Sequence, residues 1–474
     1  MRWAALIFAA STLPLAACSD DSDAPTGGGG GGGGAPAAEG TRVRNGFIRD
    51  DDGRALVLRG MNLAGAHKNP PYFSFHTQED FQRLRDEWGM NAIRFLITWA
   101  AVEPEQGVFD DAYLDAVAER MDWARSAGLH VVLDMHQDVY GEGFVLGGGD
   151  GAPRWTCDES NYESFEPDPN QWFFNYLRPE VIACYDHFWN TPELHDEYIE
   201  AWRRVAERLE GYDDVILGFD PMNEPYWGSY SITFFESAHL QPFYEKLVPA
   251  VRELCPQWIA FLEPASSRNL GVPTGLVKLP FPDVVYSPHS YDRDAESGMG
   301  FDPAQREVVL KNGAALAAEA TALGAALWIG EYGGMAASPG IVEYMTAEYD
   351  AFAASGAGTT YWAYDAGGSY SVLDEDGTPR ETLLSVLVRP FPERVAGDPV
   401  SYAFDAESST FTLSYRPDAA VGAPTVISVP AMAYPDGFSV ECDGCEWSQD
   451  GAWLSITKPP AGETATVSIV PPSP

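Results

Sequence analysis

Basic residues are scarce in this 474-residue chain, which has 29 lysines and arginines against 70 aspartates and glutamates. The formal net charge of -41 repels phosphate backbones and anionic bilayers alike, so nucleic acid is not an expected partner. No stretch is acidic enough to form an interaction tail. The charge therefore indicates a well-solvated surface, suited to an extracytoplasmic or saline setting.

Motifs of several common chemistries are also missing. The sequence has no G-x-S-x-G turn between a strand and a helix, no H-E-x-x-H pair and no Walker-type loop. These absences argue against an esterase, a metallopeptidase and a nucleotide-dependent enzyme. The eight glycines at 27–34 form no phosphate cradle, because they lack a following Lys-Ser/Thr and a flanking strand. We therefore expect neither a cofactor nor a metal ion.

Cysteine is limited to six residues, and the first stands in a segment typical of exported proteins. An apolar stretch follows Arg2, and Leu15-Ala16-Ala17-Cys18 resembles the lipobox of bacterial lipoproteins. We predict a signal peptide at 1–18, acylation of Cys18 and a flexible glycine-rich linker at 19–40. An ordinary secretory signal is the alternative. In either case the protein is expected to be exported, and to be secreted or tethered to the outer face of the cell membrane.

The other five cysteines cannot all pair within the chain, because their number is odd. We expect one disulfide between Cys442 and Cys445 across an Asp-Gly turn, and another between Cys157 and Cys184 inside one long loop. Cys255 is then left as a buried free thiol. Half of a zinc site at Cys442 and Cys445 is the alternative, but no second cysteine pair or suitably spaced histidines accompany it.

Apolar strands alternate with amphipathic helices from about residue 42 to 390, which predicts a parallel sheet with helices outside. A hairpin at 42–58, turning at Asp51-Asp52-Gly53, can close one end of a barrel. Helices are predicted at 78–88, 110–127, 192–210, 304–323 and 340–355. Eight strands are predicted at 56–62, 91–97, 130–135, 215–223, 259–263, 284–289, 326–330 and 359–363. This number predicts a (β/α)8 barrel at 41–391, and an open doubly wound sheet is the alternative.

The pattern changes beyond about residue 392, where short alternating runs are separated by Gly, Pro and Asp turns. Such runs, at 402–415, 424–429, 438–442 and 465–469, predict a small antiparallel β-sandwich at 392–474. Trp447 or Trp453 could bind carbohydrate, but a lone Trp in such a strand usually belongs to a core. We therefore favour a stabilising role for this domain.

Two glutamates end apolar runs that are predicted to be buried strands. Glu224 follows the fourth strand in Asn223-Glu224-Pro225, and Glu331 follows the seventh. The reactive groups of a (β/α)8 barrel lie at the C-terminal ends of its strands, so both carboxyls are expected at one rim. Two carboxyls from different strands are what acid-assisted cleavage of a glycosidic bond requires. The sequence therefore predicts a glycosidase.

Other polar side chains end the same predicted strands: Arg94, Asp134, His136, Asp138, Asn223, His289, Tyr291 and Trp362. Any one of them could be merely the first solvated position after a strand. Packing, however, does not require carboxylate, imidazole, guanidinium and indole groups together at one end of one sheet. The set as a whole therefore indicates a site.

These residues, with Asn223-Glu224-Pro225, resemble glycoside hydrolase family 5, which places two glutamates on strands four and seven. The segment Leu133-Asp134-Met135-His136-Gln137-Asp138-Val139-Tyr140-Gly141 and the later Asp150-Gly151-Ala152-Pro153-Arg154-Trp155 are similar to the endoglycoceramidases of that family. Asn-Glu-Pro alone is a weak tripeptide, whereas the long third-strand motif is more specific. The resemblance covers about 42–390 and implies hydrolysis of the bond between glycan and ceramide in glycosphingolipids.

The resemblance also implies a role for each matching position. Glu224 is the acid/base, Glu331 is the nucleophile, and Asn223 is the partner of the sugar 2-hydroxyl. Arg94 and Tyr291 orient the nucleophile. The non-leaving sugar is contacted by Lys68, Asp134, His136 and Asp138, with Trp362 as the floor of the adjacent subsite. The insertion at 156–188 departs from the family by being longer and more polar than expected.

The two carboxyls need different protonation states. Glu331 must be ionised to attack the anomeric carbon, and we expect nearby Arg94 to lower its pKa. Glu224 must keep its proton until the aglycone leaves, which the charge of Glu331 favours. That charge disappears in the covalent intermediate, so Glu224 can then act as the base for water. We therefore predict retention of the anomeric configuration.

Two aromatic loop stretches, 69–75 and 226–235, could line an apolar groove for acyl chains or simply pack against the outer helices. Two other functions remain open. One is a β-glucosidase or β-glucanase of the same fold that acts on glucosylceramide or soluble glycans, and the other is a glycan-binding surface lipoprotein without catalysis. A binder would not need both glutamates and Arg94. We expect a monomer whose partners are its β-glycoside substrate and, through the lipid anchor, the membrane.

Overall fold

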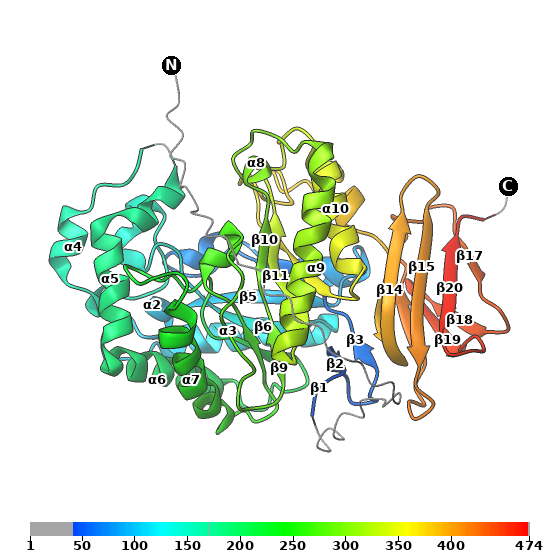
Figure 1. Ribbon diagram of the computed structural model, residues 1–474, viewed down its shortest axis with the longest axis horizontal. Coiled ribbons are helices and arrows are strands. Elements are labelled where there is room, and N and C mark those ends of the chain that lie inside the picture. Colours follow the sequence, from blue (N-terminus) through cyan, green and yellow to red (C-terminus); the bar gives the residue numbers. More distant parts are fainter. Residues whose placement is uncertain (1–40, 170, 473–474) are drawn as a thin grey trace, which may run out of the picture. The chain divides into compact units, whose positions relative to one another are not determined.

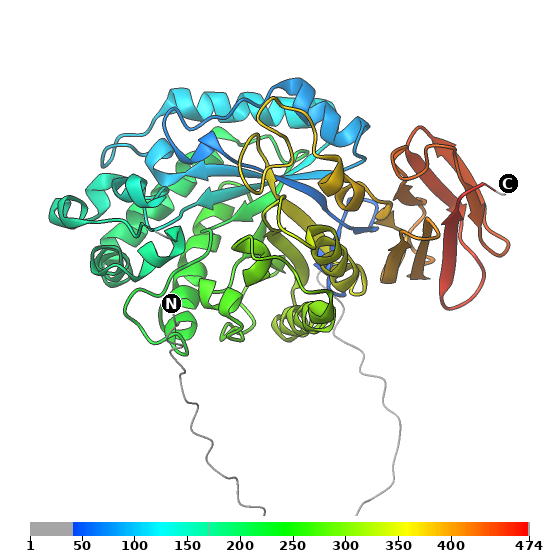
Figure 2. The same ribbon diagram turned by 90° about the horizontal axis from the view of Figure 1, so that it is seen from above.

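The computed structural model describes residues 41–169 and 171–472, and its largest sheet is a closed parallel barrel (Figures 1 and 2). β9 and β10 together form the sixth strand, and β11 pairs with both. This arrangement confirms the predicted (β/α)8 fold. The barrel strands are β4 (Arg59–Leu63), β5 (Ala92–Thr98), β6 (His130–His136), β7 (Ile216–Asp220), β8 (Ile259–Leu262), β9 (Val284–Tyr286), β10 (His289–Tyr291), β11 (Ala326–Gly333) and β12 (Gly358–Tyr364).

Helices cover the outside of the barrel, and their ends follow local chemistry. α3 begins after Asp110, whose side chain accepts a hydrogen bond from the Tyr113 N–H, and ends at Gly128 in the left-handed conformation. The five predicted helices are correct to within two residues at each end. The helices around the barrel include α1 (Gln78–Asp86), α3 (Asp111–Ala127), α5 (Pro179–Asn190), α6 (Pro192–Arg208), α7 (Gln241–Arg252), α9 (Arg306–Leu323), α10 (Ile341–Ala353) and α11 (Glu381–Leu387).

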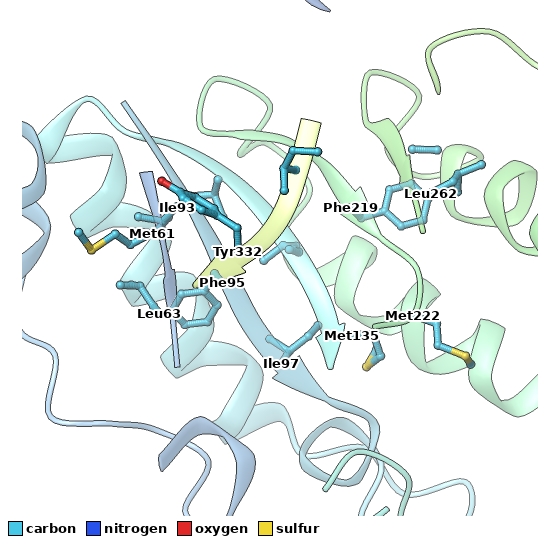
Figure 3. Packing of buried hydrophobic residues seen from close by; sticks show 14 of the residues in the cluster. Met61, Leu63, Ile93, Phe95, Ile97, Met135, Phe219, Met222, Leu262 and Tyr332 are labelled. Atoms are coloured by element: carbon cyan, nitrogen blue, oxygen red, sulfur yellow. The ribbon is translucent and has the colours of Figure 1, made fainter. Parts of the chain in front are cut away.

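Side chains of the barrel strands alternate between two environments. On β5, Ile93, Phe95 and Ile97 pack in the large core between barrel and helices (Figure 3). Ala92, at the opposite phase, belongs to a second cluster, which also contains Ile48 from the N-terminal hairpin. The hairpin thus closes the N-terminal end of the barrel, as predicted. Because apolar side chains fill the N-terminal end of the barrel, the polar side chains inside it lie toward its C-terminal end.

The C-terminal domain is a sandwich of two antiparallel sheets, as predicted. One sheet contains β14 (Gly397–Asp405), β15 (Thr410–Pro417), β17 (Ser439–Glu441) and β20 (Ala465–Val470). The other contains β13 (Phe391–Val395), β16 (Thr425–Ser428), β18 (Glu446–Asp450) and β19 (Trp453–Lys458), together with β1 (Val43–Arg44), β2 (Phe47–Arg49) and β3 (Ala55–Leu56). The N-terminal hairpin therefore belongs to this sheet as well as to the barrel, which was not predicted.

Trp453 links the sandwich to the barrel domain. Its Nε1 donates to Glu393 Oε2 at 3.1 Å, and its ring centroid lies 4.4 Å from the Arg85 guanidinium on α1. These contacts support a stabilising role for Trp453. Trp447 on β18, by contrast, is 46% exposed.

The insertion at 156–188, predicted as one long loop, is largely helical. It contains α4 (Glu159–Ser164), the 3-10 helix η4 (Trp172–Leu177) and most of α5 (Pro179–Asn190). Disulfides join Cys157 to Cys184 and Cys442 to Cys445, and Cys255 is buried and free. The predicted signal peptide, Cys18 and linker lie outside the described residues. No helix in the described part of the chain is long and apolar enough to cross a membrane.

Candidate active site

Glu331 is a buried carboxylate near the C-terminal end of β11, with one donor on each oxygen. Oε1 accepts a hydrogen bond from Arg94 Nη1 at 2.7 Å, and Oε2 accepts one from the Tyr291 hydroxyl at 2.8 Å. Burial raises the pKa of Glu331, and His289 and Arg94 oppose that rise without cancelling it. The net direction is opposite to the expected lowering, because the sequence did not reveal how deeply this carboxylate is buried.

Glu224 lies four residues beyond the end of β7, with its backbone in the left-handed region at a φ of 41°. Its N–H donates to Glu263 Oε2 at 2.9 Å. Its Oε1 accepts a hydrogen bond from Asn269 Nδ2 at 2.7 Å and lies 2.8 Å from His289 Nδ1. The carboxyl is thus held by two side chains from the loops and strands that follow β8 in the chain.

The carboxyl groups of the two glutamates lie close together. A carboxylate oxygen of Glu224, one of Glu331 and a ring nitrogen of His289 all lie within 4.8 Å of one another. Retaining glycosidases hold their carboxyls about 5 to 5.5 Å apart, whereas inverting enzymes need about 6.5 to 9.5 Å to admit a water molecule. The spacing is therefore that of a retaining enzyme.

Arg94 is fully buried in β5 and connects most of the site. Its guanidinium donates to the side-chain oxygens of Asn62 and Asn223 at 3.2 and 3.0 Å. It also forms ion pairs at 2.7 to 3.0 Å with Asp134, Asp220, Glu263 and Glu331. Asn62, Asp220 and Glu263 were not predicted as site residues. Each is nevertheless a polar residue in or directly after an apolar strand, which is the signal that identified the others.

A second group of side chains forms a flat, charged wall beside the carboxyls. Lys68 donates to Asp138, and its Nζ lies 4.7 Å from the centroid of the Trp362 ring. The His136 ring stacks on Trp362 with a centroid distance of 5.3 Å and an interplanar angle of 11°. The Tyr176 hydroxyl, which was not predicted, donates to Asp138 Oδ1 at 3.0 Å. The Trp362 indole can stack on a sugar ring, while Lys68 and Asp138 can form hydrogen bonds with its hydroxyl groups.

Asp134 contacts this wall through His136, and the prediction that it contacts the sugar directly stays a prediction. Its carboxylate is fully buried, pairs with Arg94 at 2.9 Å and accepts a hydrogen bond from His136 Nδ1 at 2.7 Å. It therefore fixes the ring of His136. Burial and Lys68 lower the pKa of His136, but Asp134 and Asp138 raise it to a net value of about 9.

The charged ring of His136 is expected to make stability depend on pH. Its pKa of about 9 exceeds the ordinary 6.5, so this stabilisation is complete below about pH 6.5 and is lost as the pH rises through 9. Denaturant titrations across this range should show the free energy of unfolding declining. His136→Gln should flatten the decline, and an equally steep decline in that variant would contradict the assignment.

Among the described residues, two groups of side chains are close enough to ligate an ion: His136, Asp138 and Asp150, and Glu224, His289 and Glu331. A protein cation already faces each group. Lys68 Nζ lies 3.7 Å from Asp150 in the first group, and Arg94 pairs with Glu331 in the second. Pairing with Lys68 and Arg94 therefore explains why the carboxylates of each group lie close together without a metal ion. The expectation that the enzyme needs no metal or cofactor stays a prediction.

A parallel (β/α)8 barrel with two facing glutamates at its C-terminal end defines a glycoside hydrolase of the retaining class. Residues 49–368 match the family described as cellulase (glycosyl hydrolase family 5), and residues 389–470 match the glycoside hydrolase family 5 C-terminal domain. The chain belongs to glycoside hydrolase family 5.

Within this family the chain is similar to endoglycoceramidases over most of its length. Endoglycoceramidase I of Rhodococcus hoagii (strain 103S) is 30% identical over 433 residues, which cover 86% of this chain and 82% of that protein. Endo-glycoceramidase II from Rhodococcus sp., in its ganglioside GM3 complex, has a TM-score of 0.81 and 33% identity, covering 90% of this chain and 99% of the other. A lactosyl-enzyme intermediate of that enzyme matches with a TM-score of 0.80 and the same identity, covering 90% and 100%. The resemblance inferred from the sequence is thereby confirmed.

Proposed function

We propose that this enzyme releases the intact glycan from glycosphingolipids by cleaving the β-glycosidic bond to ceramide. The observation that carries this proposal is an exposed apolar surface joined to the polar sugar pocket. We call this surface the apolar rim, and it consists of Val145, Leu146, Trp172, Phe173, Phe174 and Leu177. The ganglioside complex and the lactosyl intermediate of the similar Rhodococcus enzyme support the same substrate class.

The apolar rim comes from two neighbouring segments after β6, η2 (Glu142–Gly147) and η4. Asn175 Nδ2 donates to the Gly147 carbonyl at 2.8 Å and joins the two segments. Leu146 is 82% exposed and Trp172 is 51% exposed. Tyr176 lies in the same η4 turn and donates to Asp138 in the sugar pocket. Exposed patches of this kind mark sites that contact lipid or protein, so the rim places an apolar contact next to the reacting bond.

The aromatic stretches expected to line an apolar groove divide between surface and core. Phe235 is 1% exposed and packs in the main core, so it does not contact a substrate. Phe234 is 67% exposed on the segment after β7, and Phe75 is 46% exposed after β4. The available apolar surface therefore includes Phe234 and Phe75, and four residues of the apolar rim lie in the insertion that the sequence indicated to be polar.

Cleavage of the glycosidic bond proceeds by double displacement, in two steps. A carboxylate oxygen of Glu331 attacks the anomeric carbon as Glu224 gives its proton to the oxygen of the departing ceramide. The glycan is then esterified to Glu331, and Glu224 is ionised. Glu224 takes a proton from water, whose oxygen displaces the ester and releases the glycan with its original configuration. Arg94 and Tyr291 stabilise the carboxylate that is regenerated.

A panel of lactosylceramide, glucosylceramide, a β-glucan and a soluble aryl β-lactoside tests the substrate class. Free lactose from lactosylceramide is the expected product. Trp172→Ser should lower kcat/KM for lactosylceramide about tenfold, because one large buried side chain contributes about 1.5 to 3 kcal/mol. The same variant should leave the aryl lactoside unchanged. Trp447→Ser, a similarly exposed tryptophan on the sandwich, should affect neither substrate.

Two results would favour the other activities. Glucose release confined to glucosylceramide would identify a β-glucosidase, and cleavage confined to the glucan would identify a β-glucanase. An equal loss of kcat/KM for lactosylceramide and for the aryl lactoside in Trp172→Ser would show that the apolar rim does not contact the lipid.

We further propose that the enzyme is exported and held at the cell surface by an acyl chain on Cys18. The two disulfides support export, because disulfides persist in oxidising compartments. A tether of this kind would keep the catalytic domain close to lipid substrates while leaving it free to act as a monomer.

A further inference from the structure

Glu263, the residue directly after β8, is an almost fully buried carboxylate that contacts both halves of the catalytic machinery. Its Oε1 lies 2.9 Å from Arg94 Nη2 and 3.1 Å from His289 Nε2. Its Oε2 accepts the hydrogen bond from the Glu224 N–H at 2.9 Å. Its carbonyl oxygen is anchored in turn by the Tyr244 hydroxyl at 3.0 Å. One rigid carboxylate therefore spans three groups of the site.

The contact with Glu224 matters because of the backbone at that residue. A φ of 41° lies in the left-handed region, which costs a residue other than glycine roughly 1 to 3 kcal/mol and persists only when its surroundings hold it. Gln137 Nε2 holds the carbonyls of Asn223 and Glu224 at 2.8 and 3.1 Å. Glu263 holds the adjoining N–H. This conformation turns the Glu224 side chain toward Glu331.

The contact with His289 acts on the same carboxyl from its other end. His289 is buried, with Nε2 beside Glu263 and Nδ1 beside Glu224 Oε1 at 2.8 Å. Burial disfavours the charged ring, but Glu263 and Glu331 raise the pKa of His289 well above its usual range. Burial raises the pKa of Glu263, but His289 and Arg94 lower it by more. The net pKa is below its usual value, so the carboxylate is charged. Both ring nitrogens can therefore donate.

We propose that Glu263 is a positioning residue for acid/base catalysis, which sets the backbone of Glu224 and the hydrogen-bonding orientation of His289 toward its carboxyl. It touches no reacting atom. Glutamine at this position keeps the shape but offers one oxygen and one NH2 group. Either the Glu224 N–H or the Arg94 and His289 donors then face another donor, and Glu224 loses its fixed position.

The inference rests on the acid/base role of Glu224, and it predicts a dependence on the leaving group. Phenolate is a poor leaving group that needs the proton of Glu224, whereas 2,4-dinitrophenolate leaves without it. General acid catalysis contributes about 10²- to 10⁴-fold. Glu263→Gln should thus lower kcat/KM for phenyl β-lactoside about 10²-fold, and that for 2,4-dinitrophenyl β-lactoside by less than about threefold.

A second signature comes from the hydrolysis of the intermediate, in which Glu224 acts as the base. With the dinitrophenyl lactoside, kcat and KM of Glu263→Gln should fall together, because the lactosyl ester accumulates. Azide should restore kcat, since it attacks the anomeric carbon without needing a base and releases the Glu331 carboxylate. The product should be the β-lactosyl azide. Failure of azide to restore kcat would overturn the proposal.

Three variants separate this role from a merely structural one. Asn62→Ala removes an acceptor of Arg94 and no hydrogen bond of Glu224 or Glu263, so its loss of kcat/KM should be equal for both leaving groups. Glu103→Gln, at a fully buried glutamate bonded to Trp99 Nε1 at 2.8 Å, should change neither. Glu263→Asp keeps the charge but shortens the reach to the Glu224 N–H, and it should show a smaller leaving-group effect if Glu263→Gln folds poorly.

Equal losses of kcat/KM for both aryl lactosides in Glu263→Gln and Glu263→Asp would overturn the proposal. They would show that Glu263 acts on the nucleophile Glu331, through their shared contact with Arg94. Neither substrate contains ceramide. An enzyme that cleaves aryl lactosides but no glycolipid would therefore refute the proposed substrate and leave this inference standing.

Discussion

Replacing Glu331 by glutamine is expected to lower kcat by about 10⁴-fold or more on every substrate, whatever its leaving group. The amide keeps the size of the side chain and can still accept the hydrogen bond from Arg94. It cannot form the glycosyl ester, however, so the double displacement has no first step. The loss should be measured as kcat for both a glycolipid and an activated aryl lactoside.

A covalent trap gives the same prediction a second, independent measurement. A 2-deoxy-2-fluoro-β-lactosyl fluoride should inactivate the parent enzyme and leave its sugar on the peptide that contains Glu331, as mass spectrometry can establish. Glu348→Gln is the matched control. Burial raises the pKa of Glu348 to about 8, so this carboxyl is already largely neutral at pH 7 and its replacement should leave kcat unchanged. A label on another residue would refute the assignment of Glu331.

The sequence was sufficient to predict which side chains meet at the barrel rim. Strand periodicity and strand ends are local signals, and the barrel places all those ends at one rim. Arg94, Glu224 and Glu331 could therefore be brought together from positions more than a hundred residues apart.

The depth of each residue below the rim could not be predicted in the same way. Asp134 and His136 are two residues apart on β6 and share its inner face, yet only His136 stacks on Trp362 while Asp134 is fully buried beside Arg94. A strand tilted in a barrel rises gradually, and the layer that a residue occupies depends on the shear of the whole sheet. This explains why the full burial of Asp134 could not be predicted from the sequence.

Contacts between distant segments left no local signal at all. β3 pairs with β13, with Ala55 opposite Val395, which joins the start of the folded chain to the sandwich. The direction of the pKa shift of Glu331 has a similar origin, because desolvation depends on everything that surrounds a group. Pairing and burial are properties of the assembled fold, so they required the structure.

Arg94→Met is expected to reduce the free energy of unfolding by about 3 to 5 kcal/mol, because it leaves buried carboxylates without their cation. Arg94 is fully buried and pairs with four of them. Activity should fall with stability, since Glu331 loses one of its two donors. Denaturant titration and kcat on an aryl lactoside measure the two effects. Arg125→Met, at an exposed pair with Asp214, should cost no more than about 1 kcal/mol.

The pH dependence of this loss identifies its cause. If unpaired buried charge destabilises Arg94→Met, the carboxyl groups left behind take up protons as the pH falls, and the difference in stability from the parent should shrink between about pH 7 and pH 5. A cavity or a packing defect would give a difference that does not change with pH. The free energy of unfolding of Arg94→Lys should lie between those of the parent enzyme and Arg94→Met. One ammonium group restores the charge, but it cannot reach Glu331, Asp220 and Glu263 at once. A parent-like stability of Arg94→Met at neutral pH would show that the carboxylates share protons among themselves and do not depend on the guanidinium.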